Sequence, residues 1–304
     1  MTIRQLSAGM LIMWGSLFAH YADSQQRFHK QMPAGNYSGI CPLGDNLYAL
    51  VDDKAPTDGF HLLRIDIDTT RRHITQIDYQ GYRSSGLPNR DMEGICYRPS
   101  THTIFISGER DNQVYEYTLD GQRTGQRLQI PPIVAQANPN YGLEALTYDA
   151  HRHQFFTTTE RVLPGESQVR LLAFGDDLTL HRQYLYQPDL PLSPKHFHGI
   201  SALCALEDGR LLVMERQLRV PRLKLGATAL IRIYQVIPSN EEQLHKSLLI
   251  EFKTRLTVTS RKFANYEGLC QISPTLLLLV ADSQNRYKGV LRDWLCVETL
   301  PACF

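Results

Sequence analysis

The chain has 304 residues, of which 42% are hydrophobic and 21% are charged, and its net charge is +1. This balance excludes an intrinsically disordered protein, a collagen-like fibre and a nucleic-acid-binding domain of extreme charge. The length allows one large domain or two small ones.

The first 24 residues have the composition of a secretory signal peptide. One positive charge, Arg4, precedes an apolar run from Leu6 to Ala19, and Ala22-Asp23-Ser24 offers a cleavage site. The run is too short to span a bilayer comfortably, and a buried N-terminal helix is the alternative. We expect residues 1–24 to be removed on export and residues 25–304 to form one periplasmic or secreted domain without a membrane span.

Five later segments share one form. Each begins with a short β-type run, passes a turn rich in Asp, Pro, Gly, Ser or His, and returns as a second apolar run that ends on an acid. This is the pattern of a β-hairpin. The segments are YSGICPLGDNLYALVDD from Tyr37, MEGICYRPSTHTIFISGERDN from Met92, GLEALTYDAHRHQFFTTTER from Gly142, GISALCALEDGRLLVMER from Gly199 and YEGLCQISPTLLLLVADSQN from Tyr266.

Further strand-like runs between the hairpins, such as FHLLRIDI and NQVYEYTL, give each unit about four strands. Four-stranded units that repeat every 51 to 66 residues are typical of a β-propeller. The 280 residues after the signal hold five such units, so we predict an all-β, five-bladed β-propeller of four-stranded antiparallel blades. The last unit lacks a fourth strand, and QRFHKQMPA near the mature N-terminus is predicted to supply it and close the ring.

One oxygen-bearing residue opens the first strand of each unit. In a propeller that strand lines the axis, so these side chains would converge at one mouth of the channel. Converging carboxylates repel one another and lose solvent, so either some take up protons or a cation lies between them. Oxygen ligands favour a hard cation, and calcium tolerates flexible coordination best. The predicted calcium ligands are Ser38, Glu93, Glu144, Ser201 and Glu267; the alternative is that they bond backbone amides and close the channel with water.

Six cysteines follow the signal, and an even number permits disulfides without requiring them. Cys41, Cys96, Cys204 and Cys270 stand three residues after a predicted ligand, where small apolar side chains would pack on the inner strands. The remaining two, Cys296 and Cys303, could pair and pin the C-terminal tail, or stay free.

The hairpin phrases resemble the phytase-like family, also called the esterase-like domain of phytase. MEGICYRPSTHTIFISGERDN, GLEALTYD, GISALCALEDGRLLVMER and NYEGLCQISPTLLLLVADSQN carry its pattern in order, and the resemblance runs from about Asn36 to Trp294. The chain is more distantly similar to calcium-activated nucleotidases (apyrases), five-bladed propellers whose axial calcium is held by a Ser, Glu, Glu, Ser, Glu series. That similarity implies an axial calcium here, but the longer nucleotidase loops are absent, so nucleotide specificity does not carry over.

Arginines and acids at the same mouth suggest hydrolysis of an anionic small molecule. Calcium would polarise a phosphoryl or ester oxygen, arginines would hold the anion, and an acid would serve as general base. No G-x-S-x-G nucleophile motif is present. The catalytic candidates are Glu109, Arg110, Glu160, Arg161, Glu215, Arg216 and Asp282, with His196 and His198 as alternative acid/base groups.

We therefore predict a monomeric calcium-dependent phosphoester or ester hydrolase, and two alternatives stay open. Each arginine of a Glu-Arg dipeptide could pair with its own glutamate or with solvent. The protein as a whole could also be a non-catalytic propeller with structural calcium that binds an anionic ligand, a glycan or a protein, because propellers host both enzymes and binding modules.

Overall fold

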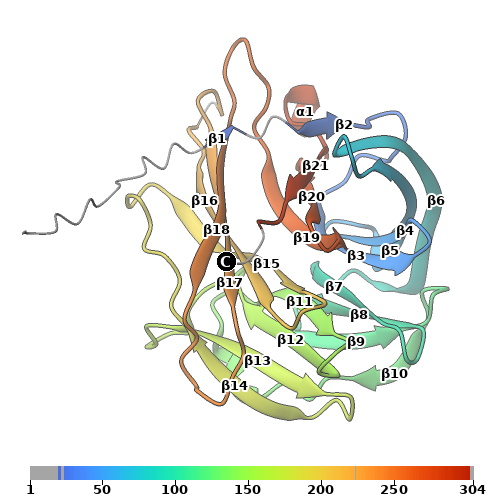
Figure 1. Ribbon diagram of the computed structural model, residues 1–304, viewed down its shortest axis with the longest axis vertical. Coiled ribbons are helices and arrows are strands. Elements are labelled where there is room, and N and C mark those ends of the chain that lie inside the picture. Colours follow the sequence, from blue (N-terminus) through green and yellow to red (C-terminus); the bar gives the residue numbers. More distant parts are fainter. Residues whose placement is uncertain (1–19, 22–23, 223, 302–304) are drawn as a thin grey trace, which may run out of the picture.

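The computed structural model describes residues 20–21, 24–222 and 224–301, and Figure 1 shows blades of antiparallel strands arranged around a common axis. Five four-stranded blades are present, and the predicted five-bladed β-propeller is confirmed. In chain order the blades are β3 (Tyr37–Gly44), β4 (Leu47–Asp52), β5 (Thr57–Asp68) and β6 (His73–Pro88); β7 (Met92–Arg98), β8 (Thr103–Gly108), β9 (Gln113–Tyr117) and β10 (Arg123–Arg127); β11 (Leu143–Asp149), β12 (Gln154–Thr159), β13 (Val169–Gly175) and β14 (Leu180–Tyr186); β15 (Phe197–Ala205), β16 (Leu211–Arg219), β17 (Thr228–Val236) and β18 (Ser247–Arg255); and β19 (Asn265–Ser273), β20 (Leu276–Asp282), β21 (Trp294–Thr299) and β2 (Gln25–Arg27).

The fifth blade takes its outer strand from the N-terminal side of the chain. β2 pairs antiparallel with β21, and Gln25 lies opposite Cys296. The neighbouring Gln26 reaches the first blade, where its Oε1 accepts a hydrogen bond from the backbone N–H of Ile74 at 2.7 Å. The predicted closure of the ring by the N-terminal segment is confirmed, although the pairing is only three residues long.

A second short segment lies before β2. β1 (His20–Tyr21) runs parallel to β18, with His20 opposite Phe252. Most of the predicted signal peptide lies outside the described residues, so its removal stays a prediction. Among the described residues, no helix has both the length and the apolar character needed to cross a membrane.

The apolar core lies between the blades. Five clusters of buried side chains each join two neighbouring blades; in one of them Phe105 of β8 packs on Phe155 of β12 with ring centroids 4.4 Å apart. Every residue of β20 is buried, because a strand in the middle of a blade is covered on both faces. Burial of apolar surface between blades therefore holds the ring together.

Glycine lets the inner strands approach one another near the axis. A Cβ on Gly39 would lie 2.5 Å from the backbone oxygen of Glu93, and a Cβ on Gly94 would lie 2.6 Å from the backbone nitrogen of Leu146. No L side chain fits such distances without displacing backbone. Because these glycines directly follow Ser38 and Glu93, the mouth of the channel is narrow where the predicted ligands stand.

Helical structure in the described part of the chain is limited to a 3₁₀ turn, η1 (Pro132–Gln136), and one turn labelled α1 (Tyr287–Val290). The five cysteines described there, Cys41, Cys96, Cys204, Cys270 and Cys296, are all free thiols. Cys303 lies outside the described residues, so its pairing with Cys296 stays open.

Candidate functional site

The side chains that open the inner strands meet at one end of the channel. Ser38, Glu93, Ser201 and Glu267 line a common small cavity on the axis. The fifth predicted ligand, Glu144, joins them through an arginine that contacts both Glu144 and Glu267. All five residues are buried, with exposed fractions of 3–9%. The structure thus brings these residues to one place.

Arg216 of β16 occupies the centre of this group. Its Nη2 lies 3.1 Å from Oε1 of Glu144 and 3.0 Å from Oε1 of Glu160, and its Nη1 contacts Glu267 and lies 3.2 Å from Oδ1 of Asn265. The guanidinium therefore bonds three carboxylates that come from the third and fifth blades. These contacts hold Arg216 in place as a structural cation at the mouth.

Glycine at position 199 makes one of these contacts possible. A Cβ on Gly199 would lie 2.5 Å from Cγ and 2.7 Å from Oε1 of Glu160. The space that a side chain would fill is taken by the Glu160 carboxylate on its way to Arg216. Glycine near the start of β15 therefore makes room for the Glu160 side chain of the preceding blade.

A further group of acids lies on the first and second blades. Carboxylate oxygens of Asp53, Asp91 and Glu93 lie within 4.8 Å of one another. Lys54 is the nearby cation: its Nζ is 2.9 Å from Oδ2 of Asp53 and also contacts Asp91, but its side chain is 59% exposed. Among the described residues, none donates a hydrogen bond to the carboxylate of Glu93, and one oxygen of Asp53 is buried without a partner. Both findings leave oxygen ligands available.

The electrostatics show that negative charge is in excess at the mouth. Burial raises the pKa of Glu93 well above its usual value, and the neighbouring Glu144 raises it further. Burial also raises the pKa of Glu144, with Glu160 the next cause. For Asp53, burial raises the pKa to about 7 against the opposing effect of Lys54. Arg216 and the exposed Lys54, the cations that are bonded to these acids, do not balance them, so a proton or a further cation is favoured there.

Arg161 has a different environment from Arg216. Its guanidinium carbon lies 4.1 Å from the ring centroid of Tyr141 and 4.2 Å from that of Phe197, so two aromatic side chains contact it. In the described ranges no hydrogen bond or ion pair engages this guanidinium, and its Nε is buried without a partner. Burial raises the pKa of Glu160, and the charges of Arg216 and then Arg161 oppose that rise. Burial lowers the pKa of His198, and the charge of Arg161 lowers it further. Arg161 is therefore a positioned cation whose donors remain available to a ligand.

Glu109 and Arg110 follow the end of β8. Arg110 is 63% exposed and its Nη1 lies 3.0 Å from the backbone oxygen of Asn89. The Glu109 carboxylate accepts a hydrogen bond from the backbone N–H of Gly142 at 3.1 Å, and burial raises its pKa. Within the described part of the chain, no arginine of the three Glu-Arg dipeptides is ion-paired with its own glutamate.

Glu215 points away from the mouth. It precedes Arg216 on β16, and neighbouring side chains of a strand lie on opposite faces. Its Oε1 accepts hydrogen bonds from Tyr186 Oη and Lys246 Nζ, each at 2.6 Å, and its Oε2 accepts one from the backbone N–H of Asp189 at 2.8 Å. These contacts lock the third blade to the fourth and leave Glu215 far from a catalytic position.

The remaining candidates divide between the mouth and its rim. Asp282 ends β20, is buried, and has a pKa raised by burial and lowered by contact with the backbone N–H of Gln284. His198 lies beside Arg161 and its pKa is lowered, first by burial, so the neutral imidazole is favoured. His196 bonds through Nδ1 to Ser193 Oγ at 2.8 Å and is held in its own loop.

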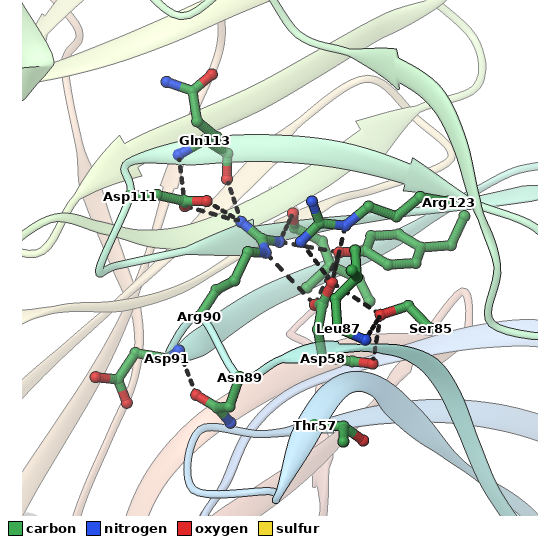
Figure 2. Close-up of polar contacts among 12 residues, drawn as sticks. Thr57, Asp58, Ser85, Leu87, Asn89, Arg90, Asp91, Asp111, Gln113 and Arg123 are labelled. Carbon is green, nitrogen blue, oxygen red and sulfur yellow. Dashed lines mark hydrogen bonds and ion pairs between the residues drawn. The ribbon is translucent and has the colours of Figure 1, made fainter.

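A second buried charged cluster lies between the first and second blades (Figure 2). The side chain of Asp58 is completely buried, and Oδ2 accepts hydrogen bonds from Arg123 Nε at 2.9 Å and Tyr117 Oη at 2.7 Å. Arg90 Nε lies 3.4 Å from Oδ1, and Arg90 Nη1 lies 2.9 Å from Asp111. Each carboxylate in this cluster thus has an arginine partner.

Comparison with known proteins identifies the family. The phytase-like family, described as "Esterase-like activity of phytase", matches residues 32–284. The chain belongs to the phytase-like family. No curated protein matches this phytase-like chain significantly.

Solved structures match the phytase-like chain at low identity. A nidogen/laminin complex is similar with 12% identity, 94% of this chain and 98% of the other covered, and a TM-score of 0.48. A luciferin-regenerating enzyme is 10% identical, with 92% of this chain and 97% of the other covered and a TM-score of 0.48. A streptogramin B lyase is also 10% identical, with 90% of this chain and 97% of the other covered and a TM-score of 0.44.

Several residues of the phytase-like mouth were missed by sequence reasoning. Asp53 and Asp91 join Glu93, Asn265 bonds both Glu267 and Arg216, and Tyr141 and Phe197 contact Arg161. Two signals were available: Asp53 ends the first hairpin phrase, in the place that other hairpins give to a catalytic candidate, and Asn265 stands two residues before a predicted ligand. The aromatic pair had no such signal, because it comes from a loop and the start of β15, which are far apart in the sequence.

The donor set of the mouth fits calcium. Its ligand atoms are carboxylate and hydroxyl oxygens, which hard cations prefer. Arg216 already neutralises the side formed by Glu144, Glu160 and Glu267. The unpaired Glu93 carboxylate and the buried Asp53 oxygen therefore mark the side where a divalent cation would be best accommodated.

Proposed function

We propose that this phytase-like protein is an exported, monomeric hydrolase that cleaves phosphoester or carboxyl-ester bonds of anionic small molecules at the carboxylate mouth of the channel, with calcium as its metal. The observation that carries this proposal is Arg161, a cation fixed by Tyr141 and Phe197 whose donors are not used by the described protein. It lies close enough to Glu160 to shift the pKa of that acid. Family membership supports the reaction class.

Arg161 would bind the anionic group of the substrate. A guanidinium donates paired hydrogen bonds in one plane, and the two aromatic contacts restrict the directions from which a ligand can approach. Arg110, which is exposed at the same mouth, would add positive charge. Arg216 does not compete for the substrate because its Nη1 and Nη2 groups are bonded to carboxylates and its Nε is buried; it is a positioning residue.

Glu109 is the best-placed general base among the four predicted acids. Its carboxylate is fixed by the backbone N–H of Gly142. Burial raises its pKa toward neutral pH, and a general base is most effective when its pKa is near the working pH. Glu160 is bonded to Arg216, and Glu215 lies between two blades. Asp282 is buried next to the axis and remains a second candidate.

Calcium would be held by Glu93 with Asp53 and Asp91. The other ring residues, Ser38, Glu144, Ser201 and Glu267, would complete its coordination. When bound, it would polarise the ester or phosphoryl oxygen and lower the pKa of a coordinated water. Asp53 and Glu93 must lose their protons to bind it, so the raised pKa values of both predict weaker calcium binding at low pH.

The test is an assay of the purified protein with p-nitrophenyl phosphate, a nucleoside diphosphate and p-nitrophenyl butyrate, each with calcium and with chelator. We expect calcium-dependent turnover of at least one compound and a roughly 100-fold lower kcat/KM in Arg161→Ala. The matched control is Arg182→Ala, in which an arginine that also lies over a tyrosine ring, 5.3 Å from Tyr184, is removed from an outer strand. Turnover unchanged by Arg161→Ala would reject the assignment of the anion site.

A specific observation favours the non-catalytic alternative. Arg216, Glu160 and Glu215, three of the seven catalytic candidates, are used in ion pairs that hold the blades. If none of the three compounds is hydrolysed but inorganic phosphate binds to wild type and not to Arg161→Ala, the protein is an anion-binding propeller with structural calcium.

A further inference from the structure

The channel has a second cavity at the end opposite the carboxylate mouth. Its volume is about 290 Å³. It is lined by the third residue after each predicted ligand, and its rim includes Pro99, Ala150 and Glu207 from the turns between the first and second strands. The proposed function does not use this chamber.

Four of the five equivalent positions in the chamber carry a thiol. Cys41, Cys96, Cys204 and Cys270 come from the first, second, fourth and fifth blades, and each is a buried free cysteine that lines the cavity. The third blade has Thr147 there, whose Oγ1 accepts a hydrogen bond from the backbone N–H of Ala205 at 3.0 Å. The arrangement is therefore a ring of four thiols interrupted by one hydroxyl.

An aliphatic ring separates the thiols from the acids. Ile40, Ile95, Leu146, Leu203 and Leu269 line both the mouth cavity and the thiol chamber. Hard oxygen ligands thus lie at one end of the channel and soft sulfur ligands at the other, with a hydrocarbon layer between them. A ligand of one end does not contact the other.

Thiols on neighbouring blades lie close enough to influence one another. Cys41 raises the pKa of Cys96, and both Cys204 and Cys41 raise the pKa of Cys270, in each case after the larger effect of burial. These neighbours define three adjacent pairs: Cys41 with Cys96, Cys41 with Cys270, and Cys204 with Cys270.

The spacing of the thiols decides which metal they suit. Tetrahedral zinc with Zn–S bonds of about 2.3 Å needs sulfurs roughly 3.8 Å apart. Across the described residues, the group of three ligand atoms found within 4.8 Å of one another is Asp53, Asp91 and Glu93, and no cysteines. The ring is too wide for zinc. A soft cation that accepts two sulfurs in line needs only one adjacent pair.

We propose that the thiol chamber is a binding site for a soft monovalent cation of the copper(I) type, coordinated by two cysteines from adjacent blades. Two thiols become thiolates and release two protons as one cation binds, with no change of oxidation state, so the site changes from charge zero to minus one. Loss of protons from thiols of raised pKa makes the affinity increase with pH. The inference is independent of the hydrolase activity at the other end.

The experiment titrates copper(I), supplied in excess bicinchoninate, into the reduced full-length protein carrying Cys303→Ser, and follows the colour of the chelator. We expect one equivalent of copper to be withdrawn per chain. The decisive variant is Cys41→Ser/Cys204→Ser, which leaves Cys96 and Cys270 on non-adjacent blades and should bind roughly 100-fold more weakly.

Two further variants separate ligation from folding. Cys296→Ser removes a buried thiol that lies outside the chamber, in contact with Ser24 and Glu298, and should bind copper as tightly as the parent. Thr147→Cys, added to the double variant, places a thiol next to Cys96 and should restore binding. Undiminished binding by the double variant, or no restoration by Thr147→Cys, would overturn the proposal.

A measurement on the protein without chamber substitutions covers the case in which the double variant does not fold. Crystals of the copper(I)-loaded protein should give an anomalous difference peak between two of the four chamber sulfurs. A peak only at Cys296 or on the surface would reject the site.

Discussion

Two buried ion clusters of this propeller use the same residue types in different proportions. At the mouth, one arginine, Arg216, bonds Glu144, Glu160 and Glu267, and Glu93 stands next to them without a hydrogen bond from the described residues. Between the first and second blades, Asp58 is bonded by Arg90, Arg123 and Tyr117 (Figure 2). The first cluster has an excess of acids, and in the second acids and arginines are balanced.

The difference separates structure from function. A balanced buried cluster has its charges compensated and needs nothing more, so the Asp58 cluster joins two blades. An unbalanced one must take up protons or bind a cation, and both processes are chemistry that a site can use. The following predictions test this distinction, beginning with the largest effect.

Arg216→Met should destabilise the protein most. The stem of the side chain keeps its volume, but Glu144, Glu160 and Glu267 lose their cation in a buried site, so we expect a loss of about 3–5 kcal/mol in the free energy of unfolding. Urea denaturation followed by circular dichroism at pH 7 measures it. Arg182→Met, on outer strand β14, is the matched control with an expected loss below about 1 kcal/mol. Equal losses in both variants would show that the axial carboxylates are not charged in the folded protein.

Calcium should stabilise the protein through the unbalanced cluster. At a calcium concentration about 100 times the Kd, the free energy of unfolding should rise by about 2.7 kcal/mol. Glu93→Gln should remove that increment because it replaces a buried ligand oxygen and its charge, whereas Asp58→Asn should retain it. An increment of the same size in Glu93→Gln would place the metal elsewhere.

Asp58→Asn should have a moderate effect. The amide keeps the shape and one acceptor oxygen but leaves Arg123 without a carboxylate and Arg90 with Asp111 alone, so we expect a loss of about 1.5–3 kcal/mol in the free energy of unfolding. The same urea experiment measures it, and phosphoester or ester turnover should be unchanged. A fall in turnover per folded molecule would mean that the balanced cluster also supports the site.

The fold was predictable because the repeat is visible in the hairpin phrases. Each hairpin phrase contains two strands, the turn between them and a final acid. Five such units predicted five blades. Closure by the N-terminal segment followed from the missing strand of the last unit. The position of four ring residues followed from register, since Ser38, Glu93 and Glu144 stand second in their inner strands and Glu267 stands third. Ser201 lies in the middle of β15, which begins earlier than the hairpin phrase indicates.

The roles of the three Glu-Arg dipeptides were not predictable, because they depend on where a strand ends. β8 ends at Gly108 and β12 at Thr159, so Arg110 and Arg161 lie in loops beyond their strands. β16 continues to Arg219, so Arg216 lies within the strand and alternation directs it to the axis while Glu215 lies on the other face. The pairing of β16 with β17 over its full length sets this difference, and it is a tertiary contact.

The last effect concerns pH and comes from Asp53, and it is the smallest when expressed per unit of pH. Its pKa is raised to about 7 in the folded protein, above the 3.8 of an unperturbed aspartate, so the folded state binds this proton more tightly than the unfolded state. The stabilising contribution is complete below pH 3.8 and is lost as the pH rises through about 7. One proton changes the free energy of unfolding by at most about 1.4 kcal/mol per pH unit.

This contribution can be isolated by comparing wild type with Asp53→Asn between pH 5 and 8 in the presence of chelator. The wild type should lose more stability than the variant as the pH rises. With saturating calcium the sign should reverse, because the metal binds the deprotonated carboxylate and stabilises the folded protein more at pH 8 than at pH 5. In Asp58→Asn, stability should change with pH as it does in the wild type, both with chelator and with saturating calcium, since Asp58 is already compensated by arginines. A pH dependence that calcium leaves unchanged would mean that the excess acids at the mouth bind protons and not a metal.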